Sequence, residues 1–215
     1  MVVAHQVRSS FIKGQIQIAI GSSYLITSQI ERSEFLGIFG SMIDFRFRGA
    51  TESDFAAILA LNLESEHFLS PLNPNKLARL CREAAVFLVA ISHDLVAGFL
   101  LVFGPQADYD SPNFLWFKAR YHDFLYVDRI VISEKFRGHH LASTLYEQLE
   151  NHALAHDVAR IVCEVNIDPP NPASLRFHES QGFMEVGRQS VPSDQKIGEQ
   201  KIVSLQAKAL KHSAG

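Results

Sequence analysis

A strand–helix–strand pattern occupies the middle of this chain. Residues 124–132 are mostly β-branched or aromatic, Leu141, Leu145 and Leu149 recur every four residues as on one face of a helix, and residues 160–167 form a second apolar run. A helix that joins two strands over this distance makes the strands parallel, with a right-handed crossover. The pattern therefore predicts an α/β fold built around one parallel pair of strands.

The segments before this unit predict helices and antiparallel strands. Residues 45–48 alternate apolar with basic side chains, as a half-buried strand does, and residues 51–54 offer N-capping side chains to a following helix. Two β-rich runs, 85–91 and 95–103, are separated by three residues that end in Asp94, which is typical of a hairpin. Between the first helix and this hairpin, apolar residues at helical spacing indicate a second helix.

The segments after the unit complete the predicted sheet. Asn171 followed by Pro172 is typical of a helix start, and Gly182 of a helix end. Two further strands are expected near residues 184–191 and 201–208. The whole pattern predicts a mixed, mostly antiparallel sheet with one central parallel pair and helices on both faces.

Composition narrows the class of protein. The 215 residues, 47% hydrophobic, suit one globular core, and a net charge of -3 provides no positive field to attract nucleic acid or an anionic membrane. The longest apolar runs, 84–91 and 95–104, are shorter than the ~20 residues that span a bilayer. Cys81 and Cys163 lie far apart in apolar runs, which argues against a disulfide framework and indicates a reducing cytoplasm.

The N-terminal segment shows no sustained period. We expect an extension over residues 1–41, either flexible or translated from a start upstream of a native initiator at Met42, and a domain over residues 42–212. A transit peptide is the alternative, since Arg8, Lys13 and several serines permit one.

Residues 104–123 form a long connection that is dense in aromatic rings. Two interpretations remain open: the segment lies over the active cleft, or it is a helical cap whose rings fill a small core of their own. In the first case three rings would contact the substrate, those of Tyr109, Trp116 and Tyr121.

Three pieces of sequence carry a resemblance to a known family. They are Ile-Val-Ile-Ser-Glu-Lys-Phe-Arg-Gly-His-His-Leu-Ala at 130–142, Glu-Val-Asn at 164–166, and Asn-Pro-Ala-Ser at 171–174 running on to Gln-Gly-Phe at 181–183. In this order and spacing the chain resembles the GCN5-related N-acetyltransferase (GNAT) superfamily over residues 43–210. The resemblance implies the acyl-CoA N-acyltransferase fold, in which the central parallel strands are splayed.

The resemblance also implies a diphosphate-binding turn. The family pattern is Arg/Gln-x-x-Gly-x-Gly/Ala, and Arg137 and Ala142 match it while His140 replaces the inner glycine. Backbone N–H groups at a helix start are unpaired and lie at the positive end of the helix dipole, so they suit a phosphate. The implied acetyl-CoA ligands at the turn are Arg137, Gly138, His139, His140, Leu141 and Ala142.

Further acetyl-CoA contacts are implied along the two central strands. The backbones of Ile130, Val131 and Ile132 would bond to the pantetheine arm, and Asn166, Asn171 and Ser174 would contact other parts of the cofactor. For Asn171, a helix cap and nothing more is the alternative.

The implied activity is transfer of an acetyl group from acetyl-CoA to a primary amine in a ternary complex. The resemblance makes Asp128 the first candidate for the base, with an ion pair to a neighbouring arginine as its alternative. Glu164 is the second candidate, and because it lies in the middle of a strand, an ion pair with Arg160 or Arg129 is its alternative. His178 stands where the family often carries a tyrosine acid, and a surface position is its alternative.

Other assignments remain open. A non-catalytic acyl-CoA-binding module is favoured by His140 and His178, and a hydrolase would need a reactive Cys163. His152 and His156 are spaced like metal ligands, but no third ligand is identifiable, and we expect no metal. The expected partner is a small-molecule or protein amine rather than nucleic acid or a membrane, and a homodimer is left open.

Overall fold

The computed structural model describes residues 7–12, 15–20, 25–28, 44–193 and 198–210, and the chain divides into two compact units, Met1–Asp44 and Phe45–Gly215. The first unit contains an antiparallel three-stranded sheet of β1 (Val7–Ile12), β2 (Gln15–Ile20) and β3 (Leu25–Ser28). The sequence analysis did not predict these strands, although residues 15–20 alternate glutamine with isoleucine before Ala19. Met42, the expected initiator, lies outside the described residues.

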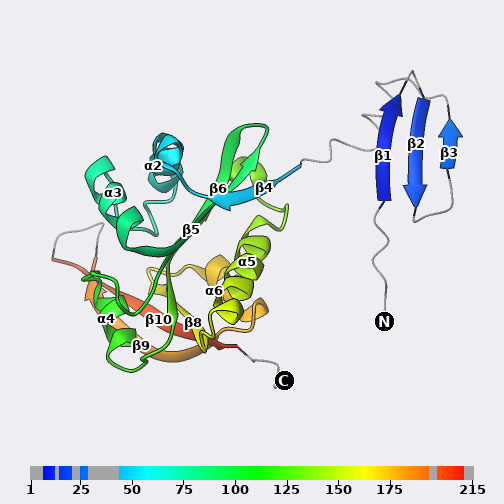
Figure 1. Ribbon diagram of the computed structural model, residues 1–215. Coiled ribbons are helices and arrows are strands. Elements are labelled where there is room, and N and C mark those ends of the chain that lie inside the picture. The colour runs from blue at the N-terminus through cyan, green and yellow to red at the C-terminus, as the bar shows by residue number, and fades with distance from the viewer. Residues whose placement is uncertain (1–6, 13–14, 21–24, 29–43, 194–197, 211–215) are drawn as a thin grey trace. The chain divides into compact units, whose positions relative to one another are not determined.

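The second unit is built on a seven-stranded sheet with the order β4-β5-β6-β7-β8-β10-β9 (Figure 1). Every neighbouring pair is antiparallel except β7 and β8, which confirms the predicted mixed sheet. The strands are β4 (Arg46–Gly49), β5 (Ala84–Ser92), β6 (Leu95–Phe103), β7 (Leu125–Ile132), β8 (Arg160–Asp168), β9 (Met184–Pro192) and β10 (Gln200–Ala209). The helices are α2 (Phe55–Glu64), α3 (Pro74–Glu83), α4 (Pro112–Lys118), α5 (Leu141–Ala155) and α6 (Pro172–Ser180), with short 3-10 turns at Glu52–Asp54 and Glu134–Phe136.

The parallel pair separates along its length. β7 and β8 pair only at Leu125–Ile161, Tyr126–Val162 and Val127–Cys163. Beyond Val127, β7 remains paired with β6 as far as Ile132, and β8 remains paired with β10 as far as Asp168. The sheet is therefore continuous on either side of the opening and splayed at its centre.

Side chains of alternate sheet residues face two different layers of helices. Leu100 and Val102 of β6 pack with Leu145 and Leu149 of α5. Phe99, which precedes Leu100 and points to the opposite face, packs with α2 and α3, which lie together over the β4–β6 end of the sheet (Figure 1). Period-two alternation along β6 thus produces helices on both faces, as predicted.

The hairpin of β5 and β6 confirms the predicted turn. His93 and Asp94 occupy it with φ of 46° and 67°. Further along, β6 approaches β7 at Gly98, where an added Cβ would lie 2.7 Å from the carbonyl oxygen of Val131 and 2.6 Å from Cδ1 of Ile132. Only glycine permits this separation between the strands, because no side chain fits the space.

The ring-rich connection contains α4. Its Phe114 and Phe117 are fully buried against Phe103, Tyr126 and Leu205 of the sheet, which favours the interpretation as a helical cap. Within the described residues, none of the helices combines the length and apolarity that a membrane crossing requires.

Candidate active site

A cavity of about 740 Å³ opens where β7 and β8 separate. One wall is formed by β7 from Val127 to Ile132 and another by β8 from Cys163 to Asn166. Its ends are closed by the turn before α5, by α6, by the α2–α3 loop and by the segment that leads into α4. The splay therefore brings together residues that the sequence analysis assigned to separate roles.

The turn before α5 has the geometry of an anion site. Gly138 has a φ of +81°, and His140 caps the helix with φ 60° and ψ 15°. The first intrahelical bond runs from the Thr144 amide to the His140 carbonyl at 3.0 Å. In the part of the chain that the structure describes, the amides from Gly138 to Ser143 have no protein acceptor, so they remain available at the positive end of the helix dipole.

Two predicted residues at this turn line the cavity, Arg137 and Ala142. Arg137 also pairs with the exposed Glu134, with 3.2 Å between Nη1 and Oε1. His140 is exposed and is not a wall residue, and His139 lies beside the ring of Phe45 at 5.8 Å between centroids. The His140 backbone thus takes the left-handed conformation that a glycine would take, and its side chain leaves the cavity clear.

The remaining residues implied for acetyl-CoA also line the cavity: Ile130, Val131, Ile132, Asn166, Asn171 and Ser174. Asn171 caps α6, because its Oδ1 accepts the Ser174 amide at 3.1 Å. Asn166 donates from Nδ2 to the Phe68 carbonyl at 3.4 Å. Both asparagines therefore have a structural role at the cavity wall, and cofactor contact for them stays a prediction.

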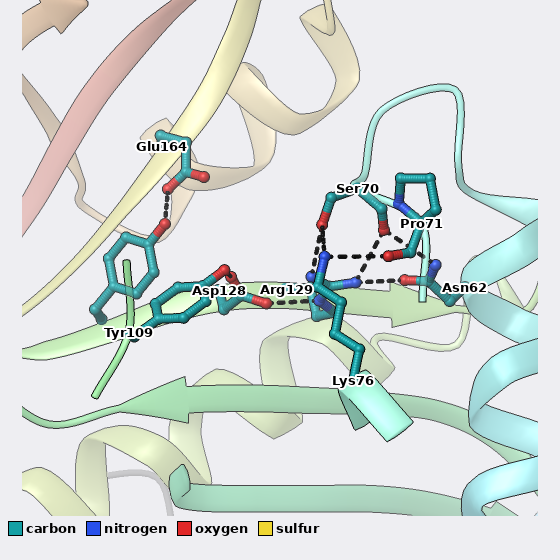
Figure 2. A network of polar contacts seen from close by, with 9 residues as sticks. Asn62, Ser70, Pro71, Lys76, Tyr109, Asp128, Arg129 and Glu164 are labelled. Atoms are coloured by element: carbon teal, nitrogen blue, oxygen red, sulfur yellow. Dashed lines mark hydrogen bonds and ion pairs between the residues drawn. The ribbon is translucent and has the colours of Figure 1, made fainter. Parts of the chain in front are cut away.

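Asp128 is bonded on both carboxylate oxygens (Figure 2). Its side chain is 5% exposed, Oδ1 accepts the hydroxyl of Tyr109, and Oδ2 accepts Nε of Arg129 at 2.6 Å. The ion pair with a neighbouring arginine, which was the alternative to a catalytic role, is therefore present.

Glu164 has a different environment. Its Oε2 accepts a hydrogen bond from the Tyr126 hydroxyl at 2.7 Å (Figure 2). Burial raises the pKa of the Glu164 carboxyl to about 7, although that hydrogen bond acts to lower it. Neither arginine named as an alternative partner pairs with it: Arg129 is bonded to Asp128, and Arg160 lies over the Tyr121 ring at 4.2 Å. A cavity carboxyl with such a pKa can accept a proton near neutral pH.

His178 is buried rather than on the surface, with 4% exposure, and it lines the cavity. Nδ1 lies 2.8 Å from the Ser174 carbonyl, which can only accept, so Nδ1 carries the proton. Nε2 then accepts the hydroxyl of Tyr146 at 2.8 Å. Burial lowers the pKa of His178, which favours the neutral ring.

The three rings predicted to contact substrate have different positions. Tyr109 lines the cavity. Trp116 instead packs over Gly187 and beneath Arg120, whose guanidinium carbon is 3.7 Å from the ring centroid. Tyr121 stacks on Phe117. The structure places these last two rings among the packing of α4, outside the set of wall residues.

Sequence reasoning missed the α2–α3 loop. The cavity wall includes several polar and aromatic residues from this loop and from α3: Ser65, His67, Phe68, Ser70, Lys76 and Arg79. No motif marked them, and the only available signal was a proline-interrupted stretch between two helices.

The histidine pair on α5 makes local contacts. The rings of His152 and His156 stack at 4.2 Å, and Nδ1 of His156 bonds to the His152 carbonyl. Over the residues for which the structure gives positions, no group of three or more His, Cys, Asp or Glu side chains is arranged to hold a metal ion.

Comparisons with known proteins agree with this architecture. A family model described as the acetyltransferase (GNAT) family matches residues 55–183, more than half of the chain. A comparison with curated protein sequences gave no significant match.

Solved structures of the same fold cover most of the chain. A GNAT-family acetyltransferase from Streptococcus pneumoniae is 21% identical with a TM-score of 0.59, over 78% of this chain and 100% of that one. The ribosomal-protein-S18-alanine N-acetyltransferase of Escherichia coli is 16% identical with a TM-score of 0.60, over 80% and 97%. A Salmonella typhimurium protein, described as an acetyltransferase and solved with its cofactor acetyl-CoA, is 20% identical with a TM-score of 0.57, over 80% and 97%.

Proposed function

Because the chain belongs to the GNAT acetyltransferase family, we propose that it transfers an acetyl group from acetyl-CoA to a primary amine by direct attack in a ternary complex. The observation that carries the proposal is a single cavity whose wall contains both the helix-start turn with available amides and the carboxyl of Glu164. A donor held at the turn and an amine beside Glu164 would share that cavity.

The residues at the donor end fit acetyl-CoA. The amides from Gly138 to Ser143 and the guanidinium of Arg137 suit a diphosphate, and the free edge of β7 beyond Val127 suits an extended amide-containing arm. When bound there, acetyl-CoA would supply the thioester. Ile130, Val131 and Ile132 would position it, with Asn166, Asn171 and Ser174 on the facing side.

We propose Glu164 as the general base. An alkyl ammonium has a pKa of ~10.4, so the amine must lose a proton before its nitrogen can attack. A carboxyl whose pKa is raised to about 7 accepts that proton more readily than an ordinary glutamate. Asp128, the first candidate from the sequence, has both oxygens committed to Tyr109 and Arg129, and this favours Glu164 over it.

The remaining steps balance without a covalent enzyme intermediate. The neutral amine nitrogen bonds to the carbonyl carbon, the carbon–sulfur bond breaks, and the proton that the nitrogen loses as the amide forms is the one that the thiolate takes up. His178 and Ser174 are the proposed relay for that proton: Nδ1 of the neutral His178 ring lies 3.2 Å from the Ser174 hydroxyl, which lines the cavity and would pass a proton to the sulfur as the ring takes one up. The acceptor is a small-molecule or protein amine.

The test is an assay of free CoA thiol over a panel of amines, with acetyl-CoA affinity measured by calorimetry. For Glu164→Gln we expect kcat to fall by about 100-fold or more, because general-base catalysis contributes ~10² to 10⁴, while the acetyl-CoA Kd stays unchanged. The wild-type kcat/KM should rise with pH through about 7. Acetyl-CoA binding without thiol release for any amine would indicate a non-catalytic module instead.

A further inference from the structure

The adjacent residues Asp128 and Arg129 bond to two separate segments of the cavity wall (Figure 2). One is the α2–α3 loop, residues 65–73, and the other is residues 109–113, which end in the first two residues of α4. Both segments line the same cavity as Glu164, and the Phe68 carbonyl of the α2–α3 loop accepts a hydrogen bond from Asn166 of β8. A single ion pair on β7 thus connects two loops that lie far apart from each other in the sequence.

Arg129 holds the α2–α3 loop. Its Nη1 donates to Asn62 Oδ1 at 2.7 Å and to the Ser70 carbonyl at 3.3 Å, and its Nη2 donates to Ser70 Oγ at 3.1 Å. Asn62, fully buried on α2, donates to the same Ser70 carbonyl at 3.3 Å. The position of Ser70 is therefore fixed by bonds to both its backbone and its side chain.

Asp128 holds the second segment through the hydroxyl of Tyr109. The Tyr109 ring also packs against Phe103 at 4.5 Å and Phe114 at 5.7 Å between centroids. Because Asp128 and Arg129 are 5% and 2% exposed at their side chains, each is the counterion that makes burial of the other tolerable. Movement of either residue would disturb both loops.

We propose that the Asp128–Arg129 pair is a positioning device that fixes the separation of the α2–α3 loop and residues 109–113, and so determines how tightly the acceptor amine is held. The kinetic part of this proposal depends on the proposed function. The structural part, that the pair restrains both loops, stands apart from any activity.

The experiment removes one side-chain bond to one loop at a time and leaves the ion pair, and the bonds to the Ser70 carbonyl, in place. Tyr109→Phe removes the hydroxyl bonded to Asp128, and Ser70→Ala removes the hydroxyl bonded to Arg129 and Lys76. Ser53→Ala is the matched control, since it removes an exposed serine hydroxyl bonded to Thr51 outside the cavity wall. Replacement of Arg129 itself is avoided because it would leave Asp128 buried and unpaired.

Two readouts are measured on the full chain. Hydrogen exchange should accelerate at the Phe68 and Leu69 amides in Ser70→Ala, and at the Ala107 and Asp108 amides in Tyr109→Phe. The KM for the acceptor should rise about three- to tenfold in each, the scale of one lost hydrogen bond, while kcat falls less and the acetyl-CoA Kd stays within about twofold.

The outcomes separate the two proposals. Unchanged exchange in both variants would overturn the positioning role whether or not the protein is active. Faster exchange with an unchanged acceptor KM in an active enzyme would overturn it too, as would equal losses of acceptor and acetyl-CoA affinity. Failure of the wild-type chain to acetylate any amine would overturn the transferase proposal alone, and the exchange data would still decide the restraint of the loops.

Discussion

Tyr126 of β7 donates its hydroxyl to Glu164 of β8 across 2.7 Å, and the rest of its side chain is fully buried in the core that also contains Phe114 and Phe117. Tyr126 lies one position before Val127, the last paired residue of β7, and Glu164 lies one position beyond Cys163, the last paired residue of β8. The carboxyl is thus held by a neutral donor and exposed to the cavity. Burial raises its pKa, and the hydroxyl limits the rise.

Tyr126→Phe should raise the pKa of Glu164 further, because the hydrogen bond that stabilises the carboxylate is lost while the ring still fills its place. In a pH profile of kcat/KM the acid limb should move to higher pH. The free energy of unfolding should fall by about 1 kcal/mol, the usual value of one hydrogen bond. An acid limb at the wild-type position would show that the limb does not report Glu164.

Glu164→Gln should change the pH dependence of stability. The wild-type carboxyl has its pKa raised from 4.5 to about 7 in the folded protein, so the folded state binds more protons between these values and stability falls as pH rises through them. The glutamine variant lacks this loss and should gain up to about 3 kcal/mol over the wild type between pH 4 and pH 8. Urea unfolding at the two pH values measures the difference, and parallel curves for the two proteins would contradict the assignment.

Asp54→Asn should destabilise the fold at neutral pH. Arg48 donates to both carboxylate oxygens at 2.7 and 2.8 Å and lowers the pKa of Asp54 to about 2. This contribution is complete above pH ~3.8 and is lost as pH falls through about 2. Because the Arg48 side chain is 46% exposed, we expect only about 1–2 kcal/mol at pH 7 and a convergence with the wild type near pH 2. A loss that persists at pH 2 would have to come from packing.

His140→Gly should retain acetyl-CoA affinity within about threefold, because the backbone already has the left-handed conformation and the imidazole is not a wall residue. His140→Val provides the contrast, since a β-branched residue in this conformation is strained by about 1–2 kcal/mol and should weaken binding. Calorimetric titration of both variants is the measurement. A large loss in the glycine variant would mean that the imidazole itself contacts the cofactor.

Gly98→Ala should weaken both the fold and acetyl-CoA binding. The added methyl would lie 2.7 Å from the Val131 carbonyl, so β6 and β7 would have to move apart, at a cost of about 1–3 kcal/mol. Gly49→Ala is the control, because nothing lies within 4 Å of the position of its added Cβ. The two variants should differ in thermal unfolding and in acetyl-CoA titration. Equal behaviour would show that the close approach of β6 to β7 does not require glycine at position 98.

The parts of the fold that were predictable depend on local chemistry. Asn171 was expected to begin a helix, and its Oδ1 does accept the Ser174 amide. The hairpin turn at Asp94 and the helix of residues 141–155 were likewise marked by neighbouring residues alone. Such signals persist because the interactions that produce them span only a few positions.

The ranking of the two carboxylates needed tertiary structure. Asp128 and Glu164 each lie in an apolar strand beside candidate arginines, and nothing local shows that Arg129 turns toward Asp128, Asn62 and Ser70. The α2–α3 loop was missed for the same reason, since its importance comes from contacts with residues about sixty positions away. The raised pKa of Glu164 likewise depends on burial that no sequence window records.

The short pairing of β7 with β8 has a mechanical consequence for the domain. Two blocks of strands, β4 to β7 and β8 to β10, share only three paired positions across the centre of the sheet. A small rotation of one block against the other would break few hydrogen bonds, yet it would change the width of the opening at every residue from Asp128 to Ile132. The sheet is therefore easiest to deform along the opening between β7 and β8, where the ligands are proposed to enter.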